Sequence, residues 1–138
     1  MPTFIERFLA LPFMPLVARI SMTYVFWASG LFHLFQWDEN VQVLAARGWE
    51  TPVFLNAAIV AVNLIGAGLI IQGRFAWLGA GGLMAFTALT ILLVHRFWTM
   101  QPPDSIPVML TAWEHITVIG ALFLFLVYDQ RSRPGSTP

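Results

Sequence analysis

Hydrophobic residues in this chain fall into four long runs, which are separated by short segments rich in Gly, Pro and charged residues. A transmembrane helix needs about 20 consecutive, mainly apolar residues, and each run has about that length. The pattern therefore predicts four membrane-spanning helices, over residues 15–35, 53–71, 75–94 and 107–128.

The segments between the runs indicate how the helices are connected. Only Gln72-Gly73-Arg74 joins the second and third runs, which predicts a tight antiparallel hairpin. Between the first and second runs, a short interfacial helix is expected from an N-cap at Asp38 to Ala46, ended by Gly48. The fold class is thus an all-α integral membrane four-helix bundle with up-down topology. We expect an interfacial segment over 1–14, a transmembrane domain over 15–128 and a disordered tail over 129–138.

The composition agrees with a membrane protein. The 138 residues are 58% hydrophobic and 10% charged, whereas soluble domains carry about 25% charged residues. The net charge is zero and no basic run is present, which argues against a nucleic-acid partner. Cysteine is absent, which excludes disulfides and thiolate-held clusters. The expected environment is the lipid bilayer.

The arginines are distributed unequally between the two ends of the predicted bundle. One end has only Arg47 and Arg96. The positive-inside rule places the other, more basic end in the cytoplasm, so both termini are expected on the cytoplasmic side of a bacterial inner membrane. The basic end holds Arg7, Arg19, Arg74, Arg131 and Arg133.

Small residues recur at helical spacing along the second and third runs. Membrane helices pack through small residues, because these let two backbones approach closely. Packing within the bundle is the main interpretation, and a ligand groove along the same residues is the alternative. The residues are Gly66 and Gly68 on the second run, and Gly81 and Ala85 on the third.

Ionisable residues gather at the outer end of the predicted bundle. The first span ends in GLFHLFQWDE, the third in VHRFW, and the fourth begins with SIPVMLTAWEHI. An ionisable residue in the membrane costs about 2.5–3.5 kcal/mol on insertion scales, so it is a functional candidate by default. The candidate polar pocket consists of His33, His95, Arg96, Glu114 and His115.

Three interpretations of this cluster stay open. The residues anchor the helices at the interface, with Glu114 paired to Arg96 or to a histidine. Alternatively, Glu114 and a histidine exchange protons with a quinone headgroup. A third interpretation is a metal or haem site held by His33, His95 and His115, but no ligand-spacing motif supports it.

The fourth span and the inner polar residues give further expectations. Helical spacing predicts that Thr111, Glu114, Val118 and Ala121 form the inward face of the fourth span. Arg19 lies about one turn inside the first span, where it would reach the cytoplasmic surface or pair with a backbone carbonyl or a polar side chain. Asn63 shares a face with Gly66 in the middle of the second span, which predicts an interhelical hydrogen bond.

The order of these motifs resembles the DoxX family of small four-helix membrane proteins. The resemblance runs from Arg19 to Tyr128 and rests on several segments. Two positions depart from the family pattern, because His33 stands where lysine is common and Asn63 where glutamate is typical. The matching segments are FWASGLFHLF, RGWETP, NLIGAGLIIQGRFAWLG, VHRFW and HITVIGALFLFLVYD.

The resemblance implies a redox-linked membrane protein. The expected function is an accessory or quinone-interacting subunit of a membrane redox complex, without independent catalytic activity. Quinone is then the candidate cofactor, and other membrane subunits or further copies of the chain are the candidate partners. The alternatives are a purely structural subunit of a larger complex and, with less support, a small-molecule transporter.

Overall fold

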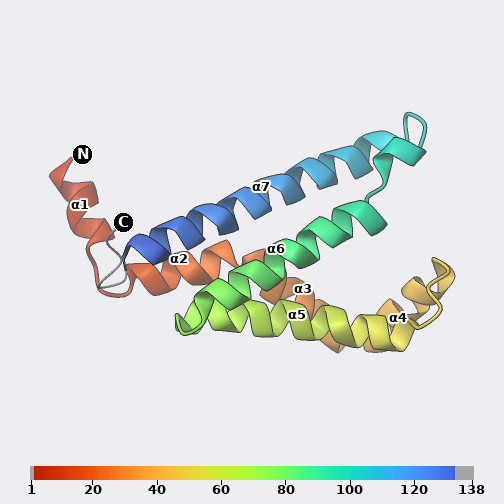
Figure 1. Ribbon diagram of the computed structural model, residues 1–138, viewed down its shortest axis with the longest axis horizontal. Coiled ribbons are helices and arrows are strands. Elements are labelled where there is room, and N and C mark those ends of the chain that lie inside the picture. The colour runs from red at the N-terminus through yellow and green to blue at the C-terminus, as the bar shows by residue number, and fades with distance from the viewer. Residues whose placement is uncertain (1, 133–138) are drawn as a thin grey trace.

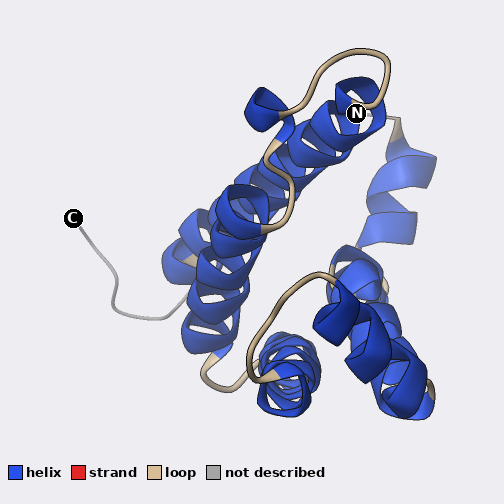
Figure 2. Ribbon diagram, turned by 90° about the vertical axis from the view of Figure 1, so that its right-hand side faces the viewer, coloured by secondary structure: helices blue, strands red, loops and turns tan. Residues whose placement is uncertain are grey.

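The computed structural model describes residues 2–132, and these form helices and no strand (Figure 2). The all-helical fold class predicted from the sequence is therefore confirmed. The elements, in chain order, are α1 (Thr3–Leu9), α2 (Met14–Met22), α3 (Tyr24–Phe35), α4 (Trp37–Ala46), α5 (Pro52–Gln72), α6 (Ala76–Leu93), the 3₁₀ turn η1 (Phe97–Thr99) and α7 (Ser105–Arg131).

Three segments are long and apolar enough to cross a membrane. They are Pro52–Gln72, Ala76–Thr99 and Ser105–Arg131. The first predicted span is divided between α2 and the shorter apolar helix α3. At 1.5 Å per residue, residues 14–35 extend over about 33 Å, which is close to the thickness of the hydrocarbon layer. We therefore expect α2 and α3 to make the remaining crossing together.

The break between α2 and α3 occurs at Thr23. The Thr23 hydroxyl donates a hydrogen bond to the Arg19 carbonyl (2.7 Å), and the Trp27 indole N–H donates to the Ile20 carbonyl (3.2 Å). Backbone groups freed at a kink need new partners in a membrane. The Trp27 indole supplies one for the Ile20 carbonyl, whereas the Arg19 carbonyl also keeps its helical bond from the Thr23 N–H. Bending of this kind is a known effect of a threonine bonded back to its own helix.

The helices pack in the spatial order α3, α5, α6, α7. Extensive contacts join α5 to α3 and α6, and α6 to α7, whereas α3 and α7 have no extensive contact among the described residues. The four apolar segments are thus arranged as an open bundle rather than a closed one. Figure 1 shows the start of α2, the α5–α6 turn and the end of α7 at one end of the molecule. The opposite end, with α4 and η1, is named the outer end.

Glycine sets the closest approach between α5 and α6. A Cβ atom added at Gly79 would lie 2.5 Å from the Gly66 carbonyl oxygen, and one added at Gly66 would lie 2.7 Å from Leu83. At Gly68 and Gly81, by contrast, a Cβ would meet nothing within 4 Å, and Ala85 is exposed. The prediction that Gly68, Gly81 and Ala85 pack helices within the chain is wrong, because these residues face outward.

The α5–α6 turn is held from the side by Arg19. Gly73 ends α5 in the left-handed conformation, at φ 81°. The Arg19 guanidinium lies against Gly73, so that a Cβ added there would be 3.2 Å from the guanidinium carbon. The carbonyl end of a helix carries partial negative charge, and the arginine is therefore well placed to stabilise it. The structure places the guanidinium beside this turn, and the expected uses of Arg19 stay a prediction.

Several expected boundaries differ from the observed ones. The interfacial helix begins at Trp37, with Gln36 rather than Asp38 as its N-cap. Gly48 does follow its end, at φ 84°. α7 continues to Arg131, so the predicted tail does not start at residue 129, and residues 133–138 lie outside the described range.

Two glycines of α6 provide a direct test of the packing. Gly79→Ala should destabilise the protein by about 1–3 kcal/mol, because the new methyl group overpacks the α5 backbone. Gly81→Ala should be neutral or slightly stabilising, since the site is open and alanine favours helix. Thermal unfolding of both variants in detergent checks this, and equal effects of the two substitutions would contradict the assigned contact.

The absence of native cysteine allows a clean topology test. We expect Gln101→Cys to react with a membrane-impermeant maleimide in intact cells, because it lies at the outer end. Arg74→Cys should react only after permeabilisation, because the positive-inside rule places the α5–α6 turn in the cytoplasm. Labelling of both variants in intact cells would refute this orientation.

Candidate functional site: an outer cleft

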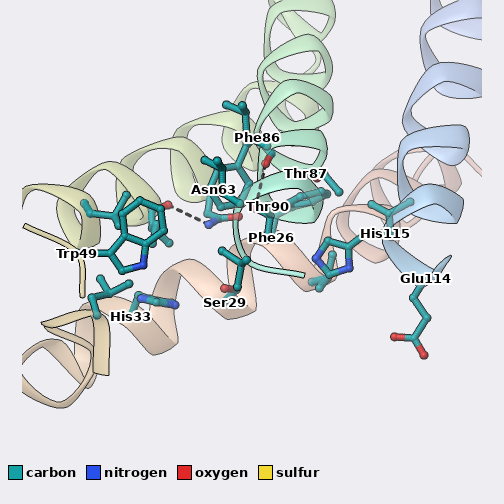
Figure 3. Close-up of a pocket in the computed structure, with 18 of the residues that line it drawn as sticks. Phe26, Ser29, His33, Trp49, Asn63, Phe86, Thr87, Thr90, Glu114 and His115 are labelled. Carbon is teal, nitrogen blue, oxygen red and sulfur yellow. Dashed lines mark hydrogen bonds between the residues drawn. The ribbon is translucent and has the colours of Figure 1, made fainter. Parts of the chain in front are cut away.

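A cleft of about 440 Å³ opens in the outer half of the bundle. It lies between α3, α5, α6 and α7, on the side where α3 and α7 have no extensive contact among the described residues. Its lining is mostly apolar, with a limited set of polar side chains at intervals (Figure 3). The polar lining residues are Ser29, His33, Arg47, Trp49, Asn63, Thr87, Thr90, Glu114 and His115.

His33 is fixed on one side of the cleft by Asn56 of α5. The Asn56 side-chain nitrogen faces the His33 carbonyl oxygen (3.4 Å), and its Oδ1 lies 2.7 Å from His33 Nδ1. Because a carbonyl oxygen only accepts, the amide nitrogen must face the backbone and Nδ1 must carry the proton. In the neutral imidazole, Nε2 is then an acceptor. Asn56 is fully buried, so this pair joins α3 and α5 away from water.

His115 of α7 lies on the other side of the cleft. Its Nδ1 is 2.8 Å from the Thr111 carbonyl oxygen, so this nitrogen donates and Nε2 is left as an acceptor. The His115 ring also packs edge-on against His95, with 4.8 Å between the ring centroids. This ring contact joins the beginning of α7 to the segment that follows α6.

The middle of the cleft is lined by three side chains that are bonded to their own helices. The amide nitrogen of Asn63 donates to the Ile59 carbonyl (2.9 Å). The hydroxyls of Thr87 and Thr90 donate to carbonyls one turn earlier, at 2.7 and 2.9 Å. The expected interhelical hydrogen bond of Asn63 is therefore not formed. Asn63 Oδ1 has no hydrogen-bond partner among the described residues, although the residue is only 1% exposed.

The mouth of the cleft carries hydrogen-bond donors. Arg47 and Trp49, from the connection between α4 and α5, line its outer rim. Both residues also border a second, more polar hollow, which His95 and Arg96 line from the other side. Among the described residues, Arg47 is therefore the one basic side chain at the rim of the cleft, and the groups deeper inside are an amide, hydroxyls and imidazoles.

Glu114 does not join the other candidate residues. It lies at the edge of the cleft and is exposed, and Figure 3 shows its carboxylate pointing away from the other labelled side chains. The inward face of α7 instead contains Ala112, His115 and Leu122. Of the predicted face, Val118 lines the cleft and packs against the core, whereas Glu114 and Ala121 are exposed. The prediction is thus only partly right, because α7 is apolar around most of its circumference.

The structure divides the five predicted residues between two hollows. His33, Glu114 and His115 border the cleft, whereas His95 and Arg96 border the second hollow. The three histidines do not come together, and no group of three potential ligands among the described His, Asp and Glu residues is arranged to hold a metal ion. The three-histidine metal or haem site therefore receives no support from the geometry.

Sequence reasoning missed several residues of the site. Asn56, Thr87 and Thr90 each occur inside an apolar run, and their polarity alone was a signal that something faces them. Arg47 and Trp49 belong to the RGWETP segment, which entered only through the family resemblance and the distribution of arginines. Their place in the cleft depends on how the α4–α5 connection folds over α3.

Comparison with known proteins gives a family and one relative. The sequence model of the DoxX family matches residues 14–96, which cover α2 to the end of α6 and leave α7 outside. The chain is also 27% identical over 118 residues to the inner membrane protein YphA of Escherichia coli strain K12. That alignment covers 86% of this chain and 84% of the relative. No solved structure matches.

The His33–Asn56 pair can be tested by a double-mutant cycle. Asn56→Leu should destabilise the protein by about 1–3 kcal/mol, because it leaves the Nδ1–H of His33 without a partner. His33→Phe should cost a similar amount, since it leaves the buried Asn56 oxygen unpaired. The double variant should cost less than the sum of the two, as measured by thermal unfolding in detergent. Additive effects would show that the two side chains are not coupled.

Proposed function

The chain belongs to the DoxX family and is a multi-pass inner-membrane protein, and from that premise we propose that its outer cleft binds the headgroup of a membrane quinone. In this proposal the protein is an accessory, quinone-interacting subunit of a membrane redox complex. Its role is to hold the headgroup, and the electron-transfer chemistry belongs to the partner subunits.

The observation that carries the proposal is the character of the cleft. Small-molecule sites are concave, about 300–1,000 Å³ in volume, and mostly apolar with a few polar groups that fix orientation. The cleft has this size and this mixture of side chains. Apolar Phe26, Ile59 and Phe86 provide flat and aliphatic contact surfaces for a ring, while His33 and His115 provide polar groups at two sides.

The position of the cleft supports a ligand that is dissolved in lipid. Its two edges, α3 and α7, have no extensive contact with each other among the described residues. The outward faces of these helices are apolar and exposed, as with Phe32 on α3 and Ile116 on α7. A molecule with a polar ring and a long apolar tail fits such a site, because the tail can stay between the helices and the lipid.

A purely structural role is the second candidate function. It is favoured by the small residues Gly68 and Gly81, where an added Cβ would meet no other helix of the described residues within 4 Å. Small residues on an exposed membrane helix permit close approach of a partner helix, from another subunit or from a second copy. This candidate requires no ligand in the cleft, so a binding experiment separates it from the quinone proposal.

Two variants of α6 make that experiment specific. Thr90→Phe should fill the cleft and reduce binding of a decyl-substituted benzoquinone at least about tenfold, which corresponds to about 1.4 kcal/mol. Leu92→Phe, on the exposed side of the same helix, should bind like the unmodified protein. Native mass spectrometry and equilibrium titration of the detergent-purified protein measure the stoichiometry and affinity. Absence of binding to the unmodified protein, or equal binding by both variants, would refute a quinone site in the cleft.

A further inference from the structure

We infer, on the basis of the proposed quinone site, that the cleft prefers the reduced hydroquinone to the oxidised quinone. The inference comes from the direction of the hydrogen bonds that the cleft side chains already make. A quinone presents two carbonyl oxygens, which only accept hydrogen bonds. A hydroquinone presents two hydroxyl groups, which also donate.

The two histidines at the sides of the cleft offer acceptors. His33 uses its Nδ1–H on Asn56 Oδ1, and His115 uses its Nδ1–H on the Thr111 carbonyl. Each neutral ring is therefore left with an Nε2 lone pair that has no hydrogen-bond partner among the described residues. A carbonyl oxygen of a quinone would repel such a lone pair, whereas a hydroxyl group would donate to it.

The side chains in the middle of the cleft also offer hydrogen-bond acceptors to a ligand. The Thr87 and Thr90 hydroxyl hydrogens are donated to the Leu83 and Phe86 carbonyls, so only oxygen lone pairs remain for a ligand. Thr87 is 3% exposed, so water has little access to its oxygen. A ligand hydroxyl in the cleft could donate a hydrogen bond to this oxygen more readily than bulk water could.

Asn63 gives the strongest single indication. One amide hydrogen is donated to the Ile59 carbonyl, which fixes the orientation of the amide. Its Oδ1 is then an acceptor in a 1%-exposed residue that lines the cleft, without a partner among the described residues. Because no side-chain oxygen or nitrogen of the described residues is both fully buried and unpaired, this oxygen is accessible from the cleft, where a ligand hydroxyl would donate to it.

Residues that can donate a hydrogen bond to a ligand are fewer inside the cleft than residues that can accept one, and most donors lie at its mouth. Arg47 and Trp49 are at the outer rim, and deeper in the cleft only Ser29 and the second amide hydrogen of Asn63 remain. Seven residues separate Asn56, which holds His33, from Asn63, or about 10 Å along α5. The acceptors of His33 and Asn63 are therefore far apart along α5. A ring with hydroxyls on opposite edges directs one hydroxyl toward each of them.

The test compares three ligands that share one decyl-substituted ring. They are the hydroquinone, the quinone and the dimethyl ether of the hydroquinone, which keeps the ring but has no hydrogen to donate. The hydroquinone is kept reduced with excess dithionite, and because the chain has no cysteine, this reductant meets no disulfide or thiol in the protein. Affinities are measured by equilibrium titration of the full-length protein in mild detergent.

We expect the hydroquinone to bind at least about tenfold more tightly than either of the other two ligands, since each unpaired acceptor disfavours binding. Equal or tighter binding of the quinone would overturn the inference and leave the quinone site itself intact. If none of the three ligands binds, the proposed function is refuted together with the inference.

Matched threonine substitutions locate the effect. Thr87→Val keeps the shape of the side chain but removes its oxygen, so it should reduce the preference for the hydroquinone over the dimethyl ether. Thr117→Val is the control, because Thr117 donates to the Trp113 carbonyl in the same way but lies outside the cleft. Asn63→Leu should reduce the preference further. An unchanged preference in Thr87→Val and in a folded Asn63→Leu protein would refute the assigned acceptors.

Discussion

The close contact between Gly79 of α6 and the Gly66 carbonyl of α5 is the constraint on which the rest of the arrangement depends. Lipid supplies no hydrophobic force between helices, so they associate through close packing and hydrogen bonds. α5 is the helix against which α3 packs, and α6 is the helix against which α7 packs. A larger residue at either glycine would therefore displace both flanking helices, and with them the walls of the outer cleft.

The cleft combines apolar walls with polar groups, several of which already donate within the chain. Asn63, Thr87 and Thr90 each donate to a carbonyl of their own helix, which lowers the cost of burying them and fixes their orientation. Only His33 and Asn56 make a side-chain hydrogen bond between helices in this region. For Asn63, Thr87 and Thr90, the bonds within each helix thus decide which hydrogen-bonding groups remain for a ligand, independently of how the helices are arranged.

The sequence predicted the helices better than their relative orientation. The apolar runs and the Gln72-Gly73-Arg74 connection defined where α5 ends and α6 begins, because these signals are local. The break at Thr23 was not predictable, since the apolar pattern continues through it and the partners of the kink are backbone carbonyls. The face of α7 was predicted only in part, because apolar residues surround the helix and give no unique inward side. The candidate residues divide between two hollows, and His33 and His115 meet different partners. Asn56 was missed since its role depends on the register between α3 and α5.

The open edge between α3 and α7 has a consequence for how strongly any tailed ligand is held. Its tail would lie in lipid both before and after binding, so the large gain of about 0.8 kcal/mol per CH₂ on leaving water is already present in the free state. The contribution of tail length to the binding free energy then cancels, and selectivity rests on the ring and its substituents alone. Occupancy of the cleft would follow the mole fraction of the ligand in the bilayer rather than its concentration in water. It would therefore change with the composition of the membrane.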